Sequence, residues 1–420
     1  MCTPICHSLR KWAQVFHRRL SAVALVAVGA LAVTTMSAPS SVAADTERAE
    51  ASSMNRDSGE RWATVIVQLE EGGGDHASRY ADVKKRIGEA VAQASPGATI
   101  EDVRDYHHVF EGFAIKVPAA TMAAIKGVQG VKGAFFEGRH EPVTDPDFWD
   151  MRDHSTDSSP DLGTASRMTG AAAASQRGQG QVIEVIDVGV DTSHEAFAGS
   201  LDAASARLTR QAMTSLAPSL GAGKDGAWVS DKIPFAYDYG DGDTDATTGN
   251  ASSRASEQGT HVASLATANG TSFTGAAPGA QLVVAKVTSD GTYTAYDTAL
   301  LAALDDAAVI KPDALTVSFS TLEGMSSDSV ALYSQVYQRL TEAGVVVNAP
   351  AGNDGNSSYG TDPDTGLLGF PAFYSSTLAV ASVNEKDAAD LGTGAITVSD
   401  FSGTGATYDL RLKPEVAAPG

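Results

Sequence analysis

Short apolar runs and one amphipathic stretch follow one another between residues 62 and 142. In Ala77–Ala94, the apolar side chains of Val83, Ile87 and Val91 recur every four positions, which is typical of one face of a helix. Apolar runs favour strands, and a second, shorter helix is expected near the end of the unit. The resulting order β-α-β-(β)-α-β predicts a small α+β ferredoxin-like sandwich. Its other elements are expected at Ala63–Leu69, Gly112–Val117, Ala119–Lys126 and Val131–Phe136.

From residue 181 onward, short apolar runs alternate with stretches in which apolar residues recur at helical spacing. The runs are almost continuously apolar, as in parallel strands buried on both faces. Helices are expected at Tyr296–Val309 and Ser329–Ala343, the second ending before Gly344. We therefore predict an α/β fold with a doubly wound parallel sheet, whose site lies where the strands end. The strands are expected at Val182–Asp187, Gln281–Val287, Ala314–Ser320, Val345–Ala349 and Thr377–Val383.

The first 44 residues have the pattern of a secretory signal peptide. Basic residues at 10, 11, 18 and 19 precede the uncharged apolar run Leu20–Met36, and small residues end at Ala44. The run is short for a membrane anchor, the alternative interpretation, since a span needs about 20 residues. We expect export and cleavage after Ala44, and no membrane span in what remains.

Charge and cysteine content restrict the function further. The chain has 30 Lys and Arg against 51 Asp and Glu, a formal net charge of −21. This argues against a nucleic-acid partner, because binding phosphates requires a basic face. The two cysteines, Cys2 and Cys6, both lie in the signal region, so no disulfide or cysteine-ligated metal site is expected beyond it.

Three segments carry polar residues at the predicted ends of strands or at the start of a helix. Asp187 ends the first apolar run, Gln258-Gly259-Thr260-His261 opens a helix of small residues, and Asn353 follows a strand on a glycine-rich turn. An amide on such a turn can stabilise an oxyanion. Taken singly, each segment is better explained as an ordinary turn or capping residue.

In this order and spacing, the segments resemble the subtilases, subtilisin-like serine endopeptidases, over roughly residues 166–420. Lys232–Tyr239 resembles the lactocepin-type cell-envelope branch, and residues 62–142 resemble the family's inhibitory propeptide. The resemblance implies polypeptide substrates and the propeptide as partners, and acyl transfer by an Asp-His-Ser triad. It gives the Asp role to Asp187, the oxyanion role to Asn353, and backbone pairing with substrate to Ser318, Phe319 and Ser320.

The same resemblance exposes a missing base. Position 258, where the family has its catalytic His, is Gln, and a carboxamide cannot accept a proton near neutral pH. His261 lies on another turn of the helix and Glu257 points about 100° away, so neither is expected to replace it. The family's nucleophilic Gly-Thr-Ser-Met-Ala segment would follow residue 420, and Gly270-Thr271-Ser272 lies in the place of a variable loop.

No cofactor is expected, with calcium as a possible exception. Asp241, Asp243 and Asp245 alternate in an acidic loop and offer the oxygen ligands that Ca²⁺ prefers. An EF-hand is excluded because Ala246 and Ser252 replace its Gly and Glu. A solvated acidic loop explains the three side chains better.

Two interpretations follow from the resemblance. In the first, the chain is a secreted subtilase precursor, extracellular or associated with the cell envelope, and inactive as written. In the second, it is a secreted pseudoprotease that binds peptides or proteins. Both predict a signal peptide (1–44), a propeptide (45–145) that stays attached, a linker with an entry helix at Ala165–Ala174 (146–180) and a truncated catalytic domain (181–420).

Overall fold

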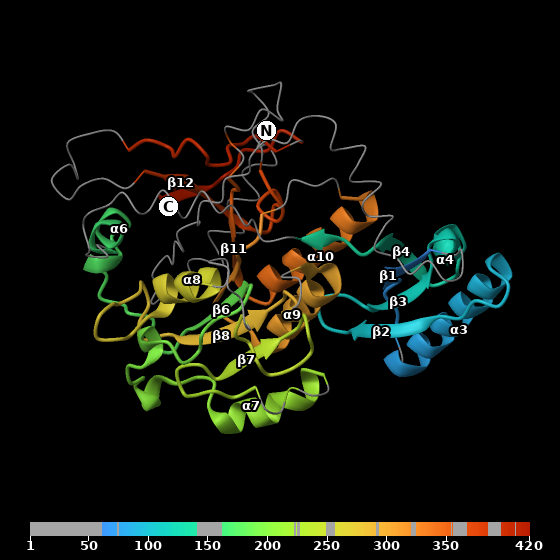
Figure 1. Cartoon of the computed structure of the whole chain (residues 1–420), viewed down its shortest axis with the longest axis horizontal. Helices are drawn as coiled ribbons and strands as arrows, with labels where there is room; N and C mark the ends of the chain where they lie inside the picture. The colour runs from blue at the N-terminus through green and yellow to red at the C-terminus, as the bar shows by residue number, and fades with distance from the viewer. Residues whose placement is uncertain are drawn as a thin grey trace.

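The computed structural model describes residues 61–73, 75–140, 162–221, 224, 227–248, 257–290, 294–320, 325–353, 355, 368–384, 396–407 and 409–420. Two parts lie side by side along the long axis, with the N-terminal unit at one end beyond helices α9 and α10 (Figure 1). The predicted signal peptide, residues 1–44, and residues 146–161 of the predicted linker lie outside the described residues.

The N-terminal unit, residues 61–140, contains a four-stranded antiparallel sheet in the order β2-β3-β1-β4. The apolar stripe of α3 is buried as its spacing predicts, and Asp75 caps the helix by accepting from the backbone N–H of Ala77. One strand, β2, was not assigned from the sequence because its side chains are mostly exposed and charged. The bounds are β1 Trp62–Leu69, α3 His76–Ala94, β2 Glu101–Tyr106, β3 Gly112–Pro118, α4 Met122–Lys126, β4 Val131–Phe136 and β5 Arg139–His140.

The second part is built on a seven-stranded sheet in the order β13-β12-β11-β10-β6-β8-β7, with every neighbouring pair parallel. The predicted parallel α/β sheet is confirmed. The strand predicted for Ala314–Ser320 ends at Val317, which leaves Ser318–Ser320 as a loop beyond the sheet edge. The bounds are β6 Val182–Asp187, β7 Phe235–Asp238, β8 Gln281–Lys286, β10 Ala314–Val317, β11 Val346–Pro350, β12 Leu378–Val383 and β13 Val416–Pro419.

Helices cover the sheet, and short turns connect them. The expected entry helix begins at Leu162 and ends at Met168, and Gly170, in a left-handed conformation, stops it before the predicted end at Ala174. The α-helices are α6 Leu162–Met168, α7 Arg210–Leu216, α8 Gln258–Thr267, α9 Asp297–Ile310 and α10 Ser327–Glu342, and β9 is Ala295–Tyr296. Turns of 3₁₀-helix are Ala119–Thr121, Ala171–Ala173, Glu195–Phe197, Ala203–Ser205 and Ala217–Ser219. Among the described helices, none has both the length and the apolar character needed to cross a bilayer.

Strand β6 divides the core into two layers. Its residues Val182 and Ile186 pack with the apolar side chains of α9 and α10, whereas Ile183 and Val185 pack with those of α8. Successive side chains of a strand point to opposite faces. Because Asp187 lies an even number of positions from Val185 and from Ile183, its side chain points to the same face, toward α8.

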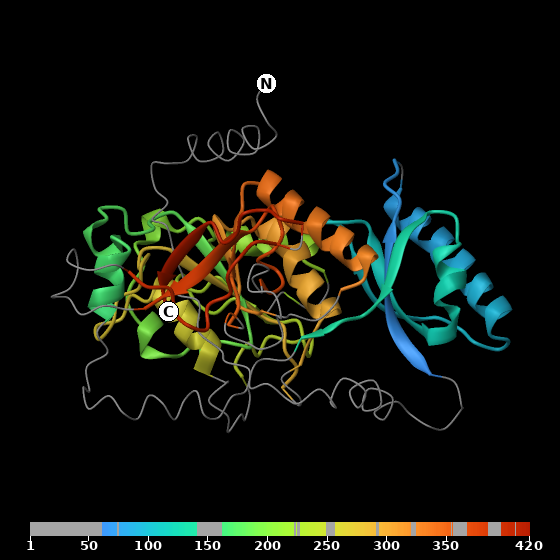
Figure 2. The same ribbon diagram turned by 90° about the horizontal axis from the view of Figure 1, so that it is seen from above.

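The N-terminal unit contacts the second part mainly through α9 and α10 (Figure 2). Asp305 of α9 accepts hydrogen bonds from the backbone N–H groups of His107, His108 and Val109, at 2.7–3.0 Å. Asp328 of α10 accepts from Ala134 N–H. Carboxylates on α9 and α10 thus accept hydrogen bonds from main-chain N–H groups of the N-terminal unit.

Candidate active site at the carboxyl edge of the parallel sheet

Asp187 is buried at the end of β6, with 1% of its surface exposed. One carboxylate oxygen, Oδ1, accepts from the Val188 N–H at 2.7 Å, and the other, Oδ2, is buried with no group of the described residues in hydrogen-bond geometry. Burial raises the pKa of Asp187 to about 7, although the Val188 N–H and the Ser318 hydroxyl favour the ionised form. Burial of the charge therefore outweighs the stabilisation that these two groups provide.

Helix α8 begins against Asp187 because two glycines allow a close approach. A Cβ atom on Gly259 would lie 2.0 Å from the Gly189 carbonyl oxygen and 3.2 Å from Asp187 Cβ. Gly189 itself has φ +127°, a conformation that favours glycine. The first turn of α8, and with it Gln258, is therefore fixed beside the end of β6.

Gln258 points to Ser318, beyond the end of β10. Its Nε2 lies 3.3 Å from the Ser318 carbonyl oxygen and 3.4 Å from Ser318 Oγ. The carbonyl can only accept, which fixes the amide nitrogen at that end of the side chain. The structure thus brings Asp187, Gln258 and Ser318 together.

Asn353 lies on the other side of the Ser318–Ser320 loop. It follows β11 and Gly352, whose φ is +100°, and it is 8% exposed. A Cβ on Gly352 would lie 2.7 Å from Ser320 Oγ, so the loop contacts the turn that carries Asn353. Phe319 packs into the core, which leaves the backbone and the two serines at the edge.

His261 and Glu257 face away from this cluster. Both line a cavity of about 540 Å³ that also contacts His194 and Ser272 but neither Asp187 nor Gln258. The expectation that neither residue takes the place of a base beside Asp187 agrees with this position.

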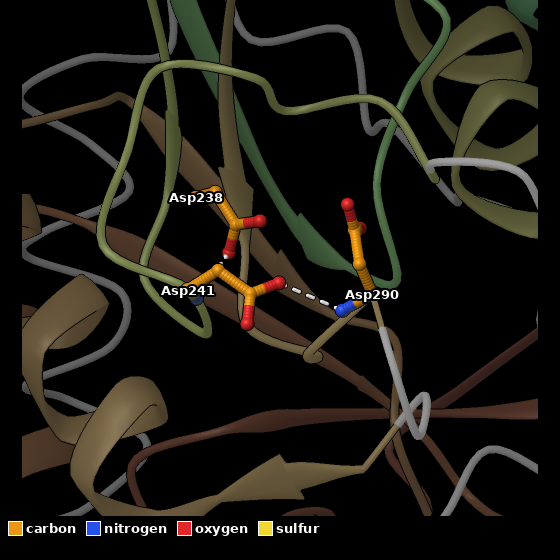
Figure 3. Close-up of side chains that lie close together, drawn as sticks. All are labelled: Asp238, Asp241 and Asp290. Carbon is orange, nitrogen blue, oxygen red and sulfur yellow. Dashed lines mark hydrogen bonds between the residues drawn. The ribbon is translucent and has the colours of Figure 1, made fainter.

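The acidic loop holds a lysine between its carboxylates. Oxygens of Asp238, Asp241 and Asp290 lie within 4.8 Å of one another (Figure 3). The Nζ of Lys286 contacts Asp238 at 2.5 Å and also pairs with Asp290. These carboxylates outweigh the effect of burial and raise the pKa of Lys286, so its ammonium supplies the positive charge there.

The other two calcium candidates are turn residues. Asp243 Oδ1 accepts from the Asp245 N–H, and Asp245 Oδ1 accepts from the Thr247 N–H and hydroxyl. Of the three predicted ligands, only Asp241 joins the carboxylate cluster. The sequence-based prediction missed the role of Lys286, whose signal is that it is the one charged residue of β8 and ends this strand.

Comparison with known protein families shows to which family this chain belongs. The model of the subtilase family, peptidase S8, matches residues 178–420. The chain belongs to the subtilase family. This match covers the whole parallel sheet together with Asp187, Gln258 and Asn353.

Two bacterial proteins that are named a proteinase and a peptidase are similar to this chain. The PII-type proteinase of Lactococcus lactis subsp. cremoris is 28% identical over 366 residues, covering 80% of this chain and 17% of that protein. The C5a peptidase of Streptococcus pyogenes is 30% identical over 238 residues, covering 53% and 19%. This subtilase chain thus spans about a fifth or less of the length of these relatives.

A solved structure supports the fold. The epidermin leader peptide processing serine protease of Staphylococcus aureus has a TM-score of 0.51 at 16% identity, covering 86% of this chain and 75% of that one. At this identity the similarity concerns the fold alone.

Proposed function

We propose that this chain binds polypeptides in extended form at the carboxyl edge of its parallel sheet, with little or no hydrolysis. The observation that carries the proposal is the environment of Gln258. Its amide donates to Ser318, while Oδ2 of the neighbouring Asp187 accepts no hydrogen bond from any described residue. A triad needs a side chain at this place that accepts a proton and is oriented by the carboxylate.

The remaining parts suit peptide binding. Ser318–Ser320 leaves the sheet as a loop in which both serines are half-buried, and an extended chain can pair with the backbone of such a segment. We assign the family's Asp position to Asp187 and its oxyanion amide to Asn353. With Gln258 in place of the catalytic base, the site keeps the groups that bind a polypeptide but has no group at this position that can accept a proton.

The alternative function is that of an active secreted serine endopeptidase. Family membership favours it, since the similar proteins are named proteinases and peptidases. The two functions differ in turnover only, because both require a polypeptide at the same edge.

We further propose that residues 1–44 direct secretion and that residues 45–145 form a propeptide. The contacts of Asp305 and Asp328 support a tightly held N-terminal unit. Without a base at position 258, this unit remains covalently attached unless another protease removes it.

Casein hydrolysis, labelling by a fluorophosphonate and binding of fluorescent casein peptides, measured on the natural full-length protein, test the proposal. We expect peptide binding without hydrolysis or labelling. Turnover at the level of the relatives would establish the endopeptidase instead. A protein that neither binds nor cleaves peptides would contradict both functions.

A further inference from the structure

β5 and β9 form a two-stranded sheet of their own. Arg139 and His140 lie antiparallel to Tyr296 and Ala295, just before α9 begins. The N-terminal unit therefore places one extended segment against β9 of the second part. The inference below rests on the proposed function, since it concerns which side chain such a segment carries.

The His140 side chain lies in a slot between the ring of Phe370 and the carboxylate of Asp297. Its ring stacks on Phe370, with centroids 5.3 Å apart and an angle of 13° between the planes. Its Nε2 lies 3.0 Å from Asp297 Oδ1. Both residues are almost fully buried, at 5% for His140 and 2% for Asp297.

Asp297 is held in place by further donors. The Tyr333 hydroxyl donates to Oδ1 at 2.6 Å, and the Gly138 N–H donates to Oδ2 at 2.6 Å. Burial alone would raise the pKa of Asp297, but the hydrogen bonds and charge of His140, with the Tyr333 hydroxyl, lower it overall. The slot therefore presents a fixed carboxylate at one edge of an aromatic ring.

A cavity of about 340 Å³ adjoins the slot, lined among others by Met122, Met325 and Lys126, whose ammonium is paired with Asp328. A lysine side chain entering the slot has no plane to stack on Phe370. A phenyl ring would stack but would donate nothing to Asp297, which would leave a buried carboxylate short of a partner.

We infer that this slot selects an imidazole side chain from an extended peptide lying along β9, with Asp297 and Phe370 as the specificity-determining residues. His140 is its occupant in this structure. The class of ligand is thus a polypeptide with histidine at the position that faces Ala295.

Chemical rescue tests the slot without any peptide. The variant His140→Gly removes the ring, and free imidazole is then added to the full chain. We expect millimolar imidazole to raise the melting temperature of His140→Gly but not of the wild type, and toluene to have a smaller effect. The effect should disappear in His140→Gly/Asp297→Asn.

Asp328→Asn is the matched control, because Asp328 also contacts the N-terminal unit but does not line the slot. Imidazole should still rescue His140→Gly/Asp328→Asn. Equal rescue by toluene, or rescue that persists without the Asp297 carboxylate, would overturn the inference.

A peptide panel tests selection directly. In the full-length protein, His140→Pro removes the imidazole and one backbone donor from β5, which opens the β9 edge. Extended peptides that differ only by His, Lys, Phe or Ala at one position are compared by fluorescence anisotropy. The His peptide should bind about tenfold more tightly than the Ala peptide, the scale of one hydrogen bond to a charged group.

The outcomes separate the two proposals. Equal binding of all peptides would refute the inference and leave the proposed function standing. No binding by any peptide would count against the proposed function, while the imidazole experiment would still decide the chemistry of the slot.

Discussion

The amide nitrogen of Gln258 lies 3.3 Å from the Ser318 carbonyl oxygen, and this contact turns the side chain toward β10. At the end of β6, Asp187 Oδ2 is buried, and no described residue donates a hydrogen bond to it. The Asp187 carboxylate and the start of α8 thus lie side by side, while the Gln258 side chain binds to Ser318.

Replacing Gln258 by His should supply the missing donor and base. In the natural full-length protein, Gln258→His is expected to raise casein hydrolysis above that of the wild type. Loss of a triad member in a subtilisin costs on the order of 10⁶ in turnover, so even partial restoration is measurable. Gln258→Asn, which has no basic nitrogen, is the control, and a wild type as active as Gln258→His would contradict the prediction.

The ionisation of Asp187 should destabilise the folded protein as the pH rises. Its pKa in the folded chain, about 7, lies above the ordinary value of 3.8, so the folded state keeps a proton that the unfolded state loses. Below the ordinary value both states are protonated and the group has no effect. The penalty grows as the pH rises to about 7 and then levels off at about 4 kcal/mol at most.

Asp187→Asn abolishes this titration. The free energy of unfolding of the variant, relative to the wild type, should therefore increase between about pH 4 and about pH 8. Urea unfolding at several pH values measures it. Asp191→Asn, at an exposed position, should show no such trend, and a flat difference for Asp187→Asn would refute the explanation.

Lys286 should be needed to neutralise the carboxylates of Asp238 and Asp290. Lys286→Met leaves them without a buried cation, which typically costs about 3–5 kcal/mol. We expect added Ca²⁺ to recover part of the melting temperature of this variant, because oxygen ligands then become available to it.

Lys232→Met is a matched control for calcium. This second buried lysine donates to the carbonyl oxygens of Pro278 and Ala280, and its pKa is lowered to about 7 by burial. Its loss should destabilise the protein without creating a response to Ca²⁺. The same calcium response in both variants, or in neither, would argue against the carboxylate cluster as its origin.

Asp305 should anchor the N-terminal unit. Asp305→Ala removes the acceptor of the N–H groups of His107, His108 and Val109 and should cost about 1–3 kcal/mol. Hydrogen exchange at residues 107–109 should accelerate more than exchange within β1. Asp202→Ala, in an exposed turn of the second part, is the control, and unchanged exchange at 107–109 in Asp305→Ala would contradict the anchoring role.

The parallel sheet was largely predictable because its strands are continuous apolar runs. β6 has the predicted bounds, Val182–Asp187. β7 was not assigned, since its four residues stand alone among turns. Ser318–Ser320 was expected to continue β10, but the chain leaves the sheet after Val317.

The site was predictable only in part. Asp187, Gln258 and Asn353 occupy recognisable positions along the chain, yet the direction of the Gln258 amide depends on Ser318, which is 60 residues away. His140 and Asp297 are 157 residues apart, and no local pattern relates them. Contacts of this kind arise when elements far apart in the sequence pack together. The periodicity of apolar residues predicts the elements but not which of their side chains meet.

The three donors to Asp305 are main-chain amides, which every amino acid except proline provides. The attachment at this point therefore depends on the path of the backbone and not on which side chains it carries. Other side chains at positions 107–109 would keep these three hydrogen bonds, although the buried Val109 is also constrained by its packing in the core. A proline at any of the three positions would remove one donor and loosen the contact between the N-terminal unit and α9.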